Sequence, residues 1–158
     1  MTNTISKTSI VEDIWRNFYD RIKDQVTSLT ITSEPYNLTI QGYHNSYSDE
    51  IIDKKTNYPF IIIEDPKLST EQFTMSRTQV DGTIMIEVFT TQSQSASKYL
   101  SKILEAIETY KSSLSDIGIT MVDLDSTDSD MFMRGLMKVH YRSAVFKFKY
   151  RYNRTGSS

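Results

Sequence analysis

The chain has 158 residues, 18 basic and 20 acidic side chains, a formal net charge of −2 and no cysteine. The lack of cysteine excludes a disulfide scaffold, a cysteine-ligated zinc site and a thiolate nucleophile. The slight negative charge argues against a chain built wholly for binding nucleic acid. The densest apolar cluster, Phe60 to Ile63, is far too short to span a bilayer, and no signal-peptide pattern is visible. We therefore expect a cytoplasmic product without membrane contact.

The first half of the chain is predicted to contain one helix, a polar excursion and two strands. Ile10, Ile14, Phe18, Ile22 and Val26 recur every four residues and predict an amphipathic helix over residues 9–29, after an N-terminal extension at 1–8. Residues 30–56 are polar and predict a long excursion with at most one short strand. Residues 58–64 read as a buried strand, and 75–90 as a second strand interrupted at 81–82 by a turn or bulge.

The second half is predicted to contain a helix and two further strands. Apolar residues at helical spacing predict a helix over residues 95–114, capped by Ser93 or Ser95 and ended by Gly118. A short strand is expected at 119–124 and a closing strand at 137–152. In the closing strand the apolar positions change from odd to even numbers, which predicts a bulge or bend near residues 143–146.

The element order is therefore α-β-β-α-β-β. It indicates an α+β fold with a mainly antiparallel β-sheet flanked by two amphipathic helices. Residues 9–152 are expected to form a single domain, and residues 153–158 a C-terminal tail.

An acidic segment precedes the closing strand and has two interpretations. Its acidic residues are Asp123, Asp125, Asp128 and Asp130. The segment begins like a calcium loop, but Asp128 stands where that loop needs glycine and Arg134 where it needs a bidentate glutamate. A solvated acidic loop is the expected structure, with a weak divalent-cation site as the alternative.

The closing strand is basic on one face and aromatic on the other. Lys147, Lys149 and Arg151 alternate with Phe146, Phe148 and Tyr150. The basic row is either the solvent-exposed face of an ordinary antiparallel strand or a cationic surface for DNA or an acidic partner. DNA contact would be backbone attraction without sequence readout. Acidic and basic segments on different sides of a subunit would favour head-to-tail association, which can close into a ring.

Motifs for catalysis are missing from the sequence. There is no glycine-rich phosphate loop, no His-Glu-x-x-His helix and no Gly-x-Ser-x-Gly turn. His44 and His140 are expected to be structural. We predict that the protein is not an enzyme and uses no cofactor. The alternative is a small metal-dependent hydrolase using Asp123, Asp125 and His140, whose activity would be lost on Asp125→Asn.

The order and character of the segments resemble the tail terminator and tail-completion (neck) proteins of tailed bacteriophages. The resemblance spans about residues 9–152 and is carried by the first helix, the strands around Phe60 and Ile84, the second helix and the closing strand. It implies a virion structural protein, assembled in the host cytoplasm, that forms a homo-oligomeric ring, commonly a hexamer. Such a ring caps the tail tube and docks it to the head connector.

If the resemblance holds, the implied partners are other copies of the chain, the tail tube protein, the head-tail connector protein and DNA passing through the lumen. The candidate lumen or interface residues are Lys147, Lys149, Arg151, Asp123, Asp125, Asp128 and Asp130. The alternative function is that of another neck, connector or baseplate subunit.

Overall fold

The computed structural model describes residues 5, 9–26, 30–33, 36–72 and 77–153. Its helices are α1 (Ile10–Val26), α2 (Asp49–Asp53) and α3 (Ser93–Asp116), with a 3-10 turn η2 (Lys55–Asn57). Its strands are β1 (Thr30–Ser33), β2 (Tyr36–Thr39), β3 (Gly42–His44), β4 (Phe60–Ile63), β5 (Lys67–Gln72), β6 (Arg77–Thr90), β7 (Ile119–Arg134) and β8 (Met137–Asn153). The predicted α+β class is confirmed.

The main sheet has the strand order β3-β4-β6-β8-β7, and β5 pairs with β6 on the side where β4 also pairs. The two long strands β6 and β8 pair antiparallel over fourteen positions, and β7 pairs antiparallel with β8 at one edge. β3 and β4 are parallel, whereas β1 and β2 form a separate antiparallel pair. The sheet is therefore mainly antiparallel, as predicted.

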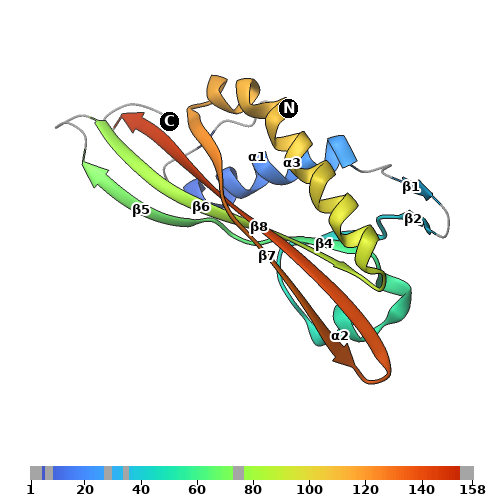
Figure 1. Ribbon diagram of the computed structural model, residues 1–158. Helices are drawn as coiled ribbons and strands as arrows, with labels where there is room; N and C mark the ends of the chain where they lie inside the picture. The colour runs from blue at the N-terminus through green and yellow to red at the C-terminus, as the bar shows by residue number, and fades with distance from the viewer. Residues whose placement is uncertain (1–4, 6–8, 27–29, 34–35, 73–76, 154–158) are drawn as a thin grey trace.

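Helices α1 and α3 cover one side of this sheet, which we call the helix face (Figure 1). The core between them includes Phe18 and Ile22 of α1, Ile103 of α3 and Phe148 of β8. The rings of Phe18 and Phe148 lie 5.4 Å apart. The four-residue spacing of the α1 stripe places its apolar side chains on this buried side, which is why the helix could be predicted from the sequence.

A second, smaller core lies on the opposite side, which we call the open face. It consists of Ile52, Tyr58, Phe60, Ile62, Phe89 and Val139, and residues of the α2 segment cover it. The rings of Phe60 and Phe89 stack with their centres 4.8 Å apart. In β4, all four side chains are buried because Ile61 and Ile63 enter the first core while Phe60 and Ile62 enter the second.

The two cores explain the change of phase in β8, and the predicted bulge at 143–146 is wrong. The even-numbered Ala144, Phe146 and Phe148 enter the core of the helix face, whereas the odd-numbered Val139 and Tyr141 belong to the core of the open face. β8 pairs with β6 through this region without a break. The buried side changes along a regular strand because a different core covers each half.

The irregular strand is β7 instead. Its register against β8 shifts between Thr120 and Asp123 and again between Leu124 and Ser126. Met121 lies in the first shift with φ of 53°, a left-handed conformation that is uncommon for a residue with a side chain. The extra residues of a bulge bend an edge strand, and edge strands are where bulges are most often found.

The predicted break at residues 81–82 is also wrong, because β6 runs unbroken from Arg77 to Thr90. Gly82 has a packing role. A Cβ atom built on Gly82 would lie 2.4 Å from Cζ of Phe148 and 2.9 Å from Cδ2 of Leu68. The glycine therefore makes room for the Phe148 ring, which is one of the established uses of glycine inside a strand.

Four further differences concern element boundaries. Residues 30–56 are not a structureless excursion, because β1, β2, β3 and α2 lie there, and β5 was not predicted. β7 is a strand of 16 residues that takes in the whole expected acidic loop. Helix α3 has Gln92 at its N-cap with no side-chain hydrogen bond, so neither Ser93 nor Ser95 caps it. Gly118 follows α3 with φ of 95°, as predicted.

Some predicted segments fall outside the described residues. These are most of the N-terminal extension at 1–8, residues 27–29 of the first predicted helix, residues 75–76 of the second predicted strand and residues 154–158 of the tail.

Candidate functional site

The basic row of β8 lies on the open face of the sheet. Lys147 pairs across the strands with Thr83 and Lys149 with Asp81, while Arg151 pairs with Gln79. The alternate side chains Phe146, Phe148 and Tyr150 are buried on the helix face. The separation into one charged and one aromatic face follows from the two-residue period of a strand and was predicted from the sequence.

Several of these cations already have polar partners within the chain. Nζ of Lys149 lies 3.5 Å from Oδ1 of Asp81, and Nε of Arg151 donates a 3.3 Å hydrogen bond to Oε1 of Gln79. Asp123 is the cross-strand neighbour of Lys147 and lies 3.7 Å from Nζ of Lys111 on α3. Part of the opposite charge of the two segments is therefore compensated inside one subunit.

A hollow of about 600 Å³ lies over this charged part of the open face. Lys67, Lys147 and Lys149 line it together with the carboxylates of Asp81 and Asp123. Three ammonium groups facing two carboxylates leave a small positive excess, which suits contact with an anion. Lys67 was not among the residues singled out from the sequence, because the strand that carries it, β5, was not predicted.

The remaining acidic candidates lie on β7, at the edge of the sheet. Asp128 is opposite Ser143 and Asp130 is opposite Tyr141, both on the open face, while Asp125 lies at the second register shift. All three are exposed. The backbone N–H of Ser129 donates to Oδ1 of Asp128 at 2.8 Å, and that of Met131 donates to Oδ1 of Asp130 at 2.7 Å. We call Asp128 and Asp130 the acidic rim.

The distal part of the β7–β8 hairpin, residues 126–145, starts beside the first turn of α3, where Nη2 of Arg142 donates a 3.4 Å hydrogen bond to Oγ of Ser93. Its tip extends beyond α1 and α3, and we call residues 126–145 the arm (Figure 1). On the helix-face side of the arm, Met131 and Met133 are 47% and 56% exposed, and Leu136 at the turn is fully exposed. Lys138, His140 and Arg142 alternate with the buried residues of β8 and lie on this same side. These three basic residues and the two methionines make up the cationic face.

The sequence pointed to only part of the arm. Met131 and Met133 are in strand β7, with Met131 opposite His140 and Met133 opposite Lys138. The alternation of Lys138, His140 and Arg142 was visible in the sequence. Their exposure depends on where α3 begins, which is beside Arg142, and one strand alone does not reveal what covers it.

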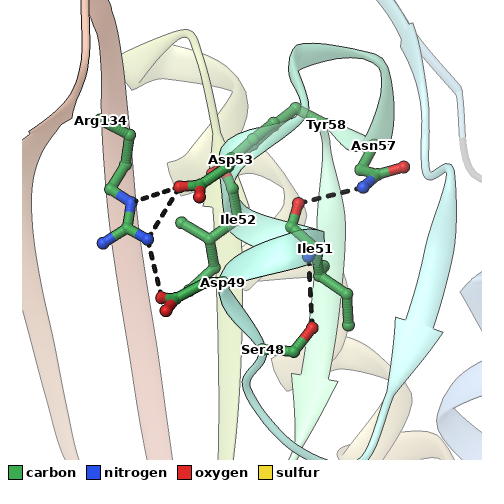
Figure 2. A network of polar contacts seen from close by, with 8 residues as sticks. All are labelled: Ser48, Asp49, Ile51, Ile52, Asp53, Asn57, Tyr58 and Arg134. Carbon is green, nitrogen blue, oxygen red and sulfur yellow. Dashed lines mark hydrogen bonds and ion pairs between the residues drawn. The ribbon is translucent and has the colours of Figure 1, made fainter.

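The turn of the arm is attached to α2 through Arg134 (Figure 2). Its Nη2 lies 2.8 Å from Oδ1 of Asp49 and 2.8 Å from Oδ1 of Asp53, and its Nε donates to Asp53 at 2.9 Å. Ser48 accepts a hydrogen bond from the backbone N–H of Ile51 at the start of this helix. One guanidinium therefore holds two carboxylates one helical turn apart and fixes the arm against the open-face core.

Replacing Arg134 by glutamine is expected to loosen the arm while leaving the main core intact. Amide hydrogen exchange in Asp49–Asp53 and at the turn of the arm should accelerate, because the neutral side chain holds neither carboxylate as an ion pair. Exchange in α3 should be unchanged, and mass spectrometry of peptic fragments separates these regions. Arg16→Gln, which removes the exposed 2.9 Å pair with Glu12, is the matched control. Unchanged exchange in the arm of the Arg134 variant would contradict this role.

A buried carboxyl group lies beside the arm on the open face. Glu87 of β6 is 2% exposed, accepts a hydrogen bond from the hydroxyl of Tyr47 and is hydrogen-bonded to Glu64. Burial is the main cause that raises the pKa of Glu87 to about 8, and the hydrogen bond and charge of Glu64 act in the same direction. Burial, with the hydrogen bond to Glu87, also raises the pKa of Tyr47. Glu87 therefore holds its proton at neutral pH.

The residues of the hydrolase alternative do not come together. Asp123 is opposite Lys147 on the open face, whereas His140 lies on the other face of the same hairpin. Lys147, the cross-strand neighbour of Asp123, is seven positions from His140 in β8, which corresponds to roughly 23 Å along a strand. Burial, with Lys138 and Arg142 nearby, lowers the pKa of His140, and burial lowers that of His44, whose ring contacts Phe60 edge to face. Asp123 and His140 cannot bind one metal ion in this arrangement.

Among the described residues, no helix is both long and apolar enough to cross a lipid bilayer. No protein-family model matches the chain, and no curated protein matches it. One solved structure with a similar arrangement is a chain of the "Virion of native gene transfer agent (GTA) particle". The likeness covers 85% of this chain and 92% of that chain, with 8% sequence identity and a TM-score of 0.39.

Proposed function

We propose that the protein is a non-enzymatic virion subunit, a tail terminator whose copies form a ring that caps the tail tube and docks it to the head connector. The observation that carries the proposal is the arm, a projecting edge hairpin with exposed apolar side chains, a cationic face and an acidic rim. A chain that already has two closed cores does not need this surface for stability. Exposed apolar rows beside charges of both signs are typical of surfaces that become buried in an assembly.

The order of elements supports the same proposal, because it retains the resemblance to tail terminator and tail-completion proteins. Both predicted helices, the strand around Phe60 and the closing strand occur in the expected order. The additional strands β3 and β5 extend one edge of the sheet, while the arm extends the other. A subunit with different surfaces at its two edges is suited to head-to-tail contact, which generates a ring when the rotation closes.

The test deletes the gene from the genome that encodes the particle and examines the assembled heads and tails by negative-stain electron microscopy. The expected result is free heads together with detached tail tubes of uncontrolled length, and normal particles after complementation with the wild-type gene. Tails of normal length joined to heads would overturn the proposal. Capped tails with a defect at the baseplate, or heads lacking the connector, would instead assign the subunit to another part of the neck or tail.

Reversing the charges of Lys147 and Lys149 to glutamate is expected to impair passage of DNA, because the open face would line the lumen through which DNA moves. Complementation should give joined particles in normal number with reduced DNA delivery, measured as transferred or infectious units per particle counted by microscopy. Lys98→Glu with Lys102→Glu, an equal change at two exposed lysines of α3 on the helix face, is the matched control. Unchanged delivery by the Lys147 and Lys149 variant would count against a lumen position for this face.

A further inference from the structure

The two surfaces of the arm carry charges of opposite sign. Lys138 and Arg142 lie on the cationic face with His140 between them, and no carboxylate of the described arm residues lies on that side. Asp128 and Asp130 belong to the opposite side. Both rows repeat every two residues, which corresponds to about 7 Å along a strand. A row of carboxylates and a row of cations with the same repeat can therefore lie opposite each other.

The exposed apolar residues of the arm make burial of the cationic face favourable. Met131, Met133 and Leu136 are exposed on the arm, and none of them belongs to either core. Methionine is common at contact surfaces because its flexible, polarisable side chain adapts to a partner. The charges would give such a contact its orientation, while the methionines would supply most of its buried apolar area.

The edge of β7 favours contact through side chains over addition of another strand. Two of its backbone donors, the N–H groups of Ser129 and Met131, are already bonded to the carboxylates of the preceding aspartates. Charged side chains along an edge strand are a common means of preventing further strand pairing. The partner that fits the cationic face must then present acidic side chains from a narrow edge, and the acidic rim of this same chain has that form.

We propose that the cationic face of one copy's arm binds the acidic rim of the arm of a second copy, in a head-to-tail contact that repeats around the assembly. This inference rests on the ring of the proposed function and assigns the residues by which its subunits join. Each copy uses a different surface toward each neighbour, so the contact is heterologous. The Arg134 bridge to α2 holds the arm in place and therefore reduces the ordering cost of association.

A charge exchange between two variants tests the contact. One variant carries Lys138→Glu and Arg142→Glu, and the other carries Asp128→Lys and Asp130→Lys. Each alone brings like charges together, so its self-association is expected to weaken by about a hundredfold relative to wild type. An equimolar mixture of the two should associate again, because each altered surface then meets a complementary one. Light scattering behind size-exclusion chromatography at low and high salt measures the mass of each sample.

The outcomes are decisive for this contact. Recovery in the mixture, with self-association of the wild type weakened by high salt, supports it. Wild-type behaviour of either variant alone, failure of the mixture to associate, or a wild-type chain that stays monomeric at low salt overturns it. Circular dichroism confirms that each variant is folded. A variant with Lys54→Glu and Lys55→Glu, two exposed lysines outside the arm, serves as the control for net charge. The gene deletion tests the terminator function separately. Tails of uncontrolled length in the deletion would support that function even if the contact between arms were overturned.

The absence of cysteine permits a second test that changes no charge. Ser126→Cys places a thiol on the open-face side of the arm and Ser129→Cys places one on the cationic-face side, both at exposed positions. Mixing the two variants with a short thiol-reactive crosslinker is expected to give cross-linked dimers, because the contact brings opposite sides together. Ser129→Cys alone should remain uncross-linked. Equal crosslinking in both samples would overturn the head-to-tail arrangement.

Discussion

The free energy of unfolding is expected to fall as the pH rises from about 4.5 to about 8, because Glu87 is a buried carboxyl whose pKa is raised from 4.5 to about 8 by the fold. A raised pKa means that the folded state holds the proton more tightly than the unfolded state does. The stabilisation is therefore complete below the unfolded pKa and is lost as the pH passes through the folded one. The loss is expected to be about 3–5 kcal/mol across this interval.

Glu87→Gln isolates this effect from other titrating groups. The amide keeps an acceptor for the Tyr47 hydroxyl and stays neutral, so the difference in unfolding free energy between variant and wild type should rise with pH in favour of the variant. Urea denaturation at several pH values measures the difference. Glu105→Gln on the exposed side of α3 is the matched control and should give a curve parallel to that of the wild type. Parallel curves for Glu87→Gln would show that the fold does not hold this proton.

Phe60→Ala is expected to cost about 3–5 kcal/mol of unfolding free energy, the usual range for removing a fully buried aromatic ring. Phe60 is 0% exposed, and its ring stacks on Phe89 and lies 4.9 Å from the ring of Tyr58. The cavity would open in the smaller core, which joins α2 to the distal half of the arm. Guanidinium denaturation should show the loss, and hydrogen exchange should show α2 and the arm opening before α1 and α3.

Phe60→Leu provides the matched control for this prediction. Leucine keeps most of the apolar volume, so its cost should stay below about 1.5 kcal/mol. If the alanine variant loosened α1 and α3 as much as α2 and the arm, the two cores would behave as one cooperative unit and the expected order of opening would be wrong.

The sequence predicts the elements that have one covered side. Helices α1 and α3 each bury a single stripe, so their apolar residues recur at helical spacing, and both were predicted. β7 is exposed on both sides from Asp123 to Met131 and has no such pattern, so only its first residues were predicted. The strand is held by its backbone pairing with β8 in the hairpin, and backbone pairing alone leaves no periodic pattern of apolar side chains.

The charged candidate residues could likewise be placed from the sequence only where a single strand determines their position. The positions of Lys147, Lys149 and Arg151 on one face follow from strand alternation, and their cross-strand register agrees with it. Their neighbours Asp81 and Lys67 could not be predicted, because the register between strands far apart in the chain is set by the packing of both cores. The cationic face of the arm was missed for a related reason. Its exposure depends on where α1 and α3 end relative to the hairpin.

The central position of β8 has a consequence for how the chain acquires its fold. β8 comes after β6 and β7 in the sequence, yet it lies between them and pairs with both. Until residue 153 has been synthesised, β6 lacks one full partner and β7 lacks its only one among the described strands. The nascent chain therefore exposes one open edge of β6 and an unpaired β7 while translation continues, a state prone to aggregation. Because the long β6–β8 pairing joins segments that are far apart in the sequence, the chain is expected to fold slowly after synthesis, when chaperone binding would be most useful.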